Sequence, residues 1–185
     1  MKNTYLLLHP SSCRYVKYIF DEIYLNNFII EGVFRVDEWE KVTEQIYKNS
    51  FKKSKTVKKH VKAQAFINIK LFGECGLLVL LTKEKIAYDK LIKDTLELKA
   101  KIRRKLYEET NNKITIYVDL NKSVYVDKKN KGENTDKIFL SFLHCPDTIE
   151  QYEQDYIFLK ENGLLQKGLS VNTIKKIIKY QSYLY

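Results

Sequence analysis

The chain is short of the residues that mark several specialised protein classes. Among its 185 residues are three cysteines, two prolines and six glycines. Cys13, Cys75 and Cys145 are odd in number and far apart, so they fit neither a disulfide framework nor a zinc site. No segment is compositionally simple, which argues against general disorder. The sequence therefore predicts a compact protein with reduced thiols.

Long apolar runs are missing too. The apolar run in the opening stretch MKNTYLLLHPSS is too short for a signal peptide. No segment elsewhere approaches the roughly 18 apolar residues of a membrane span. We therefore expect a cytoplasmic protein with no membrane partner. The sequence also has no glycine-rich phosphate loop, no G-x-S-x-G and no H-E-x-x-H, which excludes a Walker-type ATPase and predicts no dedicated metal site.

The residues that are present suffice for one hydrophobic core. Apolar residues make up 44% of the chain, and the length suits a single domain over residues 1–185. Hydrophobic spacing gives the order strand, helix, strand, helix, strand, helix, hairpin, strand, helix. This order predicts an α+β fold, a sandwich in which helices cover a mainly antiparallel sheet, and the ferredoxin-like arrangement is its simplest form.

Three details of this prediction bear on function. Apolar and polar side chains alternate around a turn-like DLNK, which predicts a β-hairpin within residues 113–137. Residues 164–185 include SVNTIKKIIKY, whose isoleucine spacing predicts a C-terminal helical extension. Residues 85–106 are predicted to be helical, with a break near Thr95.

The charge is strongly positive. Lysine and arginine number 33 against 23 acidic residues, so the net charge is +10, which favours phosphate-bearing partners. Six lysines lie in KKSKTVKKHVK, from Lys52 to Lys62, without an acidic residue. This segment has two interpretations: a solvated helix face or loop, and a contact surface for nucleic acid.

The stretch SFLHCPDT is the most chemically suggestive in the sequence. It places His144 at the end of an apolar run, just before a helix start in which Asp147 and Glu150 have capping-box spacing. A histidine beside the first amides of a helix suits phosphate acceptance, because imidazole is a competent nucleophile near neutral pH. Taken alone, the position fits a strand-end cap equally well. Asp155, on the same predicted helix, could point back toward His144.

Together with other stretches, SFLHCPDT resembles the nucleoside diphosphate kinase family, whose catalytic histidine lies in N-x-x-H-G-S-D-S. His144 matches that histidine. YLLLHP matches a first strand that ends in Lys-Pro, and GLLVLL from Gly76 matches the third strand. LIKDT and KIRRKL match segments that contact nucleotide phosphates. The resemblance covers about residues 4 to 163 and rests on the order and spacing of these stretches.

The resemblance implies a two-step reaction. A nucleoside triphosphate would phosphorylate His144, and the phosphohistidine would phosphorylate a nucleoside diphosphate. Asp155 would then align the imidazole, while His9, Thr95 and Arg103 would bind the nucleotide. Mg²⁺ would arrive on the nucleotide phosphates and need no protein cage. Nucleoside di- and triphosphates, and further copies of the chain in a homo-oligomer, are the implied partners.

The chain has more residues between Arg103 and His144 than the family pattern, so the resemblance implies that residues 113–137 are an insertion. Four positions also differ from the family pattern. The first-strand lysine is His9, a helix arginine is Asp89, the asparagine before the histidine is Ser141, and Pro146 lies in place of a small residue after it. These differences support a second interpretation, a catalytically degenerate nucleotide-binding or regulatory module of the same fold. A third interpretation is a basic nucleic-acid-binding protein that uses Lys52 to Lys62, with affinity that falls steeply with salt.

Overall fold

The computed structural model describes residues 2–48, 55–109, 115–119, 124–126, 135–139, 141–165, 168–170 and 173. In chain order the elements are β1 (Thr4–Leu8), η1 (Pro10–Tyr15), α1 (Val16–Leu25), β2 (Ile29–Val36), α2 (Trp39–Ile46), α4 (Lys55–Phe72), β3 (Gly76–Thr82), α5 (Tyr88–Glu109), β4 (Thr115–Asp119), β5 (Val124–Val126), β6 (Thr135–Phe139), β7 (Leu143–His144) and α6 (Ile149–Glu161).

Four strands form one antiparallel sheet in the order β2-β3-β1-β7. β1 lies in the middle and pairs with β3 on one side, where Leu8 is opposite Leu77, and with β7 on the other, where Leu7 is opposite His144. The predicted α+β class and the mainly antiparallel sheet are confirmed. The register also places His144 at an edge strand of this sheet, beside the central strand.

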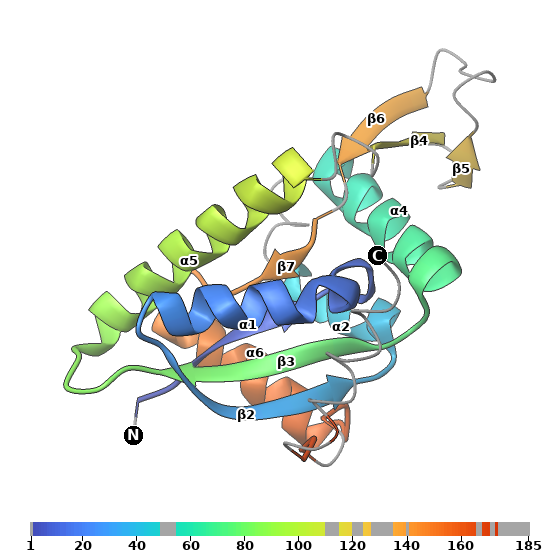
Figure 1. Cartoon of the computed structure of the whole chain (residues 1–185). Helices are drawn as coiled ribbons and strands as arrows, with labels where there is room; N and C mark the ends of the chain where they lie inside the picture. Colours follow the sequence, from blue (N-terminus) through green and yellow to red (C-terminus); the bar gives the residue numbers. More distant parts are fainter. Residues whose placement is uncertain are drawn as a thin grey trace.

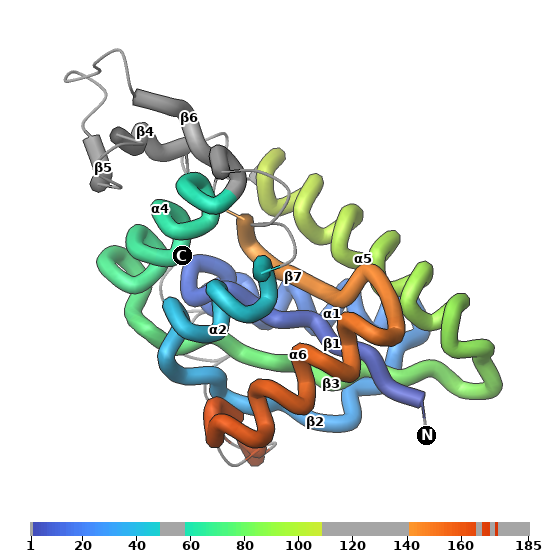
Figure 2. Tube along the Cα trace, turned by 180° about the vertical axis from the view of Figure 1, so that it is seen from behind, coloured from blue at the N-terminus to red at the C-terminus, as the bar shows by residue number. Residues whose placement is uncertain are grey.

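Side chains of the central strands alternate between two hydrophobic cores. Leu6 and Leu8 of β1 belong to the core shared with α1 and α5, whereas Tyr5 and Leu7 belong to the core shared with α2 and α6. Because both faces are covered, β1 and β3 are buried along their whole length and consist of continuous apolar runs. Figure 1 shows α1 and α5 on one side of the sheet, and Figure 2, from behind, shows α2 and α6 on the other.

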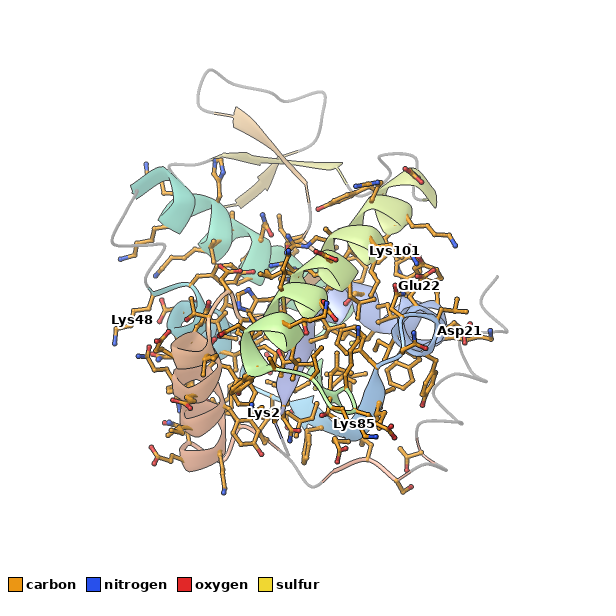
Figure 3. The ribbon with its side chains drawn as sticks, turned by 90° about the vertical axis from the view of Figure 1, so that its left-hand side faces the viewer. Lys2, Asp21, Glu22, Lys48, Lys85 and Lys101 are labelled. Carbon is orange, nitrogen blue, oxygen red and sulfur yellow. The ribbon has the colours of Figure 1, made fainter. Side chains whose placement is uncertain are left out.

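An ion pair joins the two helices of the first face. The Nζ of Lys101 on α5 lies 2.9 Å from Oε2 of Glu22 on α1, and Figure 3 shows the two side chains close together. Burial alone would raise the pKa of Glu22, but hydrogen bonds with Lys101 and Tyr18 and the charges of Lys101 and Lys105 together lower that pKa. The pair helps to fix α5, the helix that carries Arg103.

Two sequence predictions about helices are wrong. α5 runs without the break predicted near Thr95, because it contains no proline or glycine and the Thr95 hydroxyl donates to the Leu91 carbonyl at 2.7 Å within the helix. The capping residue of α6 is Thr148 rather than Asp147. Its hydroxyl accepts a hydrogen bond from the backbone N–H of Gln151 at 3.1 Å.

Residues 113–137 contain most of a second, smaller sheet. It has three antiparallel strands in the order β5-β4-β6, and it is separate from the four-stranded sheet. The pairing of β4 with β5, with Tyr117 opposite Val126, matches the predicted hairpin. These residues therefore do not add strands to the central sheet.

The predicted helix within residues 164–185 falls almost wholly outside the described residues. The described start of that segment follows the edge of β2. Leu165 forms a bridge with Val36, and the backbone N–H of Leu169 donates to the carbonyl of Val33 at 2.7 Å. Within the part of the chain that the structure describes, no helix combines the length and the apolar character needed to cross a membrane.

Candidate functional site

A cavity of about 470 Å³ lies where the end of β7 meets α5 and the start of α6. Its wall combines segments that are far apart in the sequence, including the residue that follows α2, two turns of α5 and the loop between β7 and α6. The side chains that matter below are Tyr47, Lys99, Arg103, His144, Asp147 and Gln151.

His144 is the nucleophilic side chain of this cavity. It is only 7% exposed, and its ring lies edge-on to Tyr47 with 5.2 Å between the ring centroids. Burial, followed by the nearby Lys99, His9 and Arg103, holds the pKa of His144 well below its usual 6.5. The imidazole is therefore neutral at pH 7, the form that carries a free lone pair.

Two basic side chains, one turn apart on α5, lie on the wall beside His144. Lys99 Nζ is 3.5 Å from Oδ1 of Asp147. A terminal nitrogen of Arg103 donates to the Ser141 hydroxyl at 2.7 Å and also to the Leu143 carbonyl. The buried Nε of Arg103 has no hydrogen-bond partner among the described residues. These contacts hold two positive charges where an anion would approach the imidazole.

A second cavity, of about 240 Å³, shares Tyr47 and Arg103 with the first. His9 lines it, is 4% exposed and lies edge-on to Trp39, with 4.9 Å between ring centroids. Burial, followed by the charge of Arg103, lowers the pKa of His9 to about 3. His9 therefore offers this cavity a neutral ring, and its buried Nε2 has no partner within the described part of the chain.

Asp155 lies behind the wall rather than in the cavity. It is 3% exposed, and its Oδ2 accepts a hydrogen bond from the Tyr5 hydroxyl at 2.7 Å. Burial raises the pKa of Asp155 to about 6, although hydrogen bonds with Tyr5 and Gln151 act in the opposite direction. No hydrogen bond joins Asp155 to His144 among the described residues, and Gln151 lies between them, hydrogen-bonded to both.

Thr95 is a predicted site residue that lines neither of these two cavities. Its side chain is fully buried, and its hydroxyl bonds to its own helix through the Leu91 carbonyl. Cys145, which follows His144, packs its sulfur 3.9 Å from the Thr95 carbonyl oxygen. The structure thus brings His144, Arg103 and His9 together around the two cavities, whereas Thr95 is buried outside both.

Three residues of the site were not predicted from the sequence. Lys99 could have been found, because it precedes Arg103 by four residues and helical spacing places both on one face. Gln151 carried a weaker signal, as a third-position residue that a capping box would use. Tyr47 carried none, because its position depends on how α2 packs against the sheet.

The lysine-rich segment from Lys52 to Lys62 continues into α4. Lys52 and Lys53 lie outside the described residues, whereas Lys62 on α4 forms an ion pair of 2.9 Å with Glu44 on α2. That contact favours the helix-face interpretation for Lys62.

Within the described ranges, no group of three or more His, Cys, Asp or Glu side chains is placed to hold a metal ion.

Comparison of the sequence with models of known protein families and with curated proteins gives no match. The position of a neutral histidine beside two basic side chains, next to a second polar cavity, is therefore the main basis for inferring function.

Proposed function

We propose that the protein is a phosphotransferase similar to nucleoside diphosphate kinases. His144 would accept the γ-phosphoryl group of a nucleoside triphosphate and pass it to a nucleoside diphosphate. The observation that carries the proposal is the buried, neutral imidazole of His144 in a cavity that also contains Lys99 and Arg103. A neutral nucleophile beside fixed cations suits attack on a polyanionic phosphate.

The arrangement of the sheet supports this proposal. We also propose that the fold is ferredoxin-like. The central strands and their crossing helices follow the order β1, α1, β2, β3, α5, β7, which is the β-α-β-β-α-β pattern of that fold. The sheet order β2-β3-β1-β7 places the first and third strands side by side in the centre. His144 then ends the last strand of the pattern.

The proposed chemistry has two balanced steps. In the first, a lone pair of His144 attacks the γ-phosphorus, the bond from that phosphorus to the bridging oxygen breaks, and the diphosphate leaves with the electron pair. In the second, a terminal oxygen of another nucleoside diphosphate attacks the phosphorus, and the bond to the imidazole nitrogen breaks. Lys99 and Arg103 would stabilise charge on the phosphoryl oxygens in both steps.

The two cavities suit different parts of a nucleotide. The larger one falls in the range of about 300–1,000 Å³ usual for small-molecule sites. The smaller one, with His9 and Ser141, would take a group next to the phosphates. Asp147, exposed on the wall, is the carboxylate that could face a metal carried by the nucleotide. When bound, Mg²⁺ would neutralise phosphate charge.

A second candidate function is a non-catalytic nucleotide-binding or regulatory module. The observation that favours it is the Thr95 hydroxyl, which is bonded inside α5 and so does not meet the phosphates. A homo-oligomer and a cytoplasmic location remain predictions of the sequence.

The test of the proposed function is incubation of the full chain with ATP labelled in the γ-phosphoryl group and Mg²⁺. We expect a covalent label on the protein that is stable to alkali and labile to acid, and that is discharged by added nucleoside diphosphate. A protein that binds nucleotide without taking the label would contradict transfer and support the second candidate. A protein that does neither would contradict both.

Arg103→Met should slow formation of that label by about 10- to 100-fold. The change removes a charge from the cavity, and a hydrogen bond to a charged group contributes about 1.5–3 kcal/mol. The initial rate of labelling measures the effect. Arg103→Lys keeps the charge but not the paired contacts with Ser141 and Leu143, so its rate should lie in between.

The matched control is Arg104→Met, at an exposed position on the same helix, which should label at the wild-type rate. Thermal unfolding of each variant separates slow labelling from loss of fold, because Arg103 also tethers α5 to β7. Labelling of Arg103→Met at the wild-type rate would exclude Arg103 from the phosphate site.

A further inference from the structure

An apolar patch is exposed where α1 ends and β2 begins. It consists of Tyr24, Leu25 and Ile29, which are 59%, 73% and 40% exposed. These are three of the six large apolar side chains that the described residues leave exposed, and they lie around one turn of the chain. Single exposed apolar residues are ordinary, but a group of them marks a surface that another element or molecule covers.

The chain that follows α6 approaches this patch along the edge of β2. β2 is an outermost strand of the four-stranded sheet, and Leu165 forms an antiparallel bridge with Val36 at its far end. Further along, the backbone N–H of Leu169 donates to the Val33 carbonyl at 2.7 Å. As the chain advances from Leu165 to Leu169, it therefore moves from Val36 toward Ile29. At about 3.3 Å per residue, about 13 Å of the β2 edge then separate Val33 from Ile29.

A helix begins where this edge contact ends. The Ser170 hydroxyl accepts a hydrogen bond from the backbone N–H of Thr173 at 3.1 Å, and Thr173 is helical. A serine whose hydroxyl accepts from the N–H three residues later occupies the N-cap position of a helix. Leu169, next to this cap, packs against the core shared with α1 and α5. The helix therefore starts on the face of the sheet that α1 covers.

The sequence after this cap predicts a helix with one apolar face. Three isoleucines recur at helical spacing, and three lysines would lie on the opposite side of the same helix: Ile174, Ile177 and Ile178, and Lys175, Lys176 and Lys179. A helix over residues 171–180 would span about 15 Å, which is enough to follow the rest of the β2 edge to Ile29. The isoleucine face and the patch are therefore two apolar surfaces within reach of each other.

We infer that residues 171–180 dock as a helix on the patch of Tyr24, Leu25 and Ile29, with the three isoleucines facing it. The position of the Ser170 cap and the direction of the chain along β2 favour this occupant over a separate molecule.

Charge complementarity supports the same occupant. Two exposed acidic side chains flank the patch, Glu31 on β2 and Asp21 on α1, the second of which also pairs with Lys17 at 2.9 Å. The lysines of the docked helix would bring positive charge to this side of the molecule. His144 lies on β7, at the opposite edge of the sheet from β2, so the docking does not rest on the proposed function.

The first experiment measures whether the two surfaces stabilise each other. We expect Leu25→Gln and Ile178→Gln each to lower the melting temperature of the full chain by about 4–8 °C, because each removes apolar burial. Glutamine has a helix propensity close to that of leucine, so an effect of Leu25→Gln does not come from the backbone of α1. The double variant should melt within about 2 °C of the less stable single variant, since either change already releases the helix.

Ile157→Gln is the matched control. Ile157 is 51% exposed on α6, which covers the other face of the sheet (Figure 2). Its replacement should change the melting temperature by less than about 2 °C, and its effect should add to that of Ile178→Gln.

The second experiment locates the contact. NMR of the full chain with labelled leucine and isoleucine methyl groups should show nuclear Overhauser contacts between the Leu25 methyls and the δ1 methyl of Ile174, Ile177 or Ile178. Leu25→Gln and Ile178→Gln identify two of these signals. A sample that mixes labelled with unlabelled chains distinguishes contacts within one chain from contacts between two copies.

The outcomes separate this inference from the proposed function. Methyl contacts within one chain, together with coupled melting, support the docking. Additive or absent effects of Leu25→Gln and Ile178→Gln would overturn it, and contacts found only between copies would assign the patch to a second copy instead. Leu25→Gln should take the phosphoryl label at the wild-type rate. Docking in a protein that never takes the label would contradict the proposed transfer and leave the docking supported.

Discussion

Replacement of His144 by alanine will abolish the acid-labile phosphoryl label. His144 is the histidine that lines the larger cavity, and its buried, neutral ring lies beside Lys99 and Arg103. Without the imidazole, no nitrogen nucleophile remains at that position, so the expected loss is complete rather than partial. The measurement is incorporation of label from γ-labelled ATP into the purified full chain, before and after treatment with acid.

Two further variants make this result specific. His144→Asn retains a polar side chain at a position that is 7% exposed, so it reduces the cavity that alanine leaves between Tyr5 and Tyr47. It should also fail to label while staying folded. His60→Ala, on α4, removes a histidine from another part of the chain and should keep the label. Label that persists in both His144 variants would show that phosphate is carried elsewhere.

The central strands themselves, though not their order in the sheet, could be predicted from the sequence, because the signals for a buried strand are local. GLLVLL and YLLL are apolar on both faces, and a strand buried on both faces needs that composition. The apolar run IFLSFL, residues 138–143, predicts one further strand, and this prediction is wrong. The run contains the end of β6 and the start of β7, which belong to different sheets.

The reason for this division lies in tertiary contacts. Ser141, in the middle of the run, accepts a hydrogen bond from Arg103 on its hydroxyl, and its backbone N–H donates to Gln64 Oε1 at 3.2 Å. Both partners come from helices far away in the sequence, α5 and α4. Hydrophobic spacing within the run contains no information about them.

Some residues of the candidate site could likewise be predicted from the sequence, and others could not. The placement of His144 could be predicted, because a strand end followed by a helix start is visible locally. The roles of Tyr47 and Gln151 could not, because they depend on how α2 and α6 pack around β7. Thr95 was predicted as a site residue from the resemblance alone. In this chain α5 is uninterrupted, and the Thr95 hydroxyl donates to the Leu91 carbonyl within it.

The free energy of unfolding falls between about pH 7.5 and about pH 4, and His9→Gln will make this fall smaller by about 3 kcal/mol. Burial, and then the charge of Arg103, lowers the pKa of His9 from 6.5 to about 3. The unfolded chain binds a proton at this position below about pH 6.5, whereas the folded protein does not until about pH 3. The stability that a neutral His9 contributes is therefore complete above pH 6.5 and is lost as the pH falls, at about 1.4 kcal/mol per unit.

Urea unfolding of the wild-type and His9→Gln proteins at both pH values measures this effect. Comparing the pH dependence of each protein, rather than its stability at one pH, removes the cost of altered packing against Trp39. His144, whose pKa is also lowered, adds to acid destabilisation, while Asp155, whose pKa is raised to about 6, opposes it. Both remain in the variant, so the comparison leaves the effect of His9 together with the part of the His144 shift that His9 causes. Equal acid sensitivity of the two proteins would mean that His9 is protonated in the folded state, and the smaller cavity would then offer phosphate a charge rather than a neutral ring.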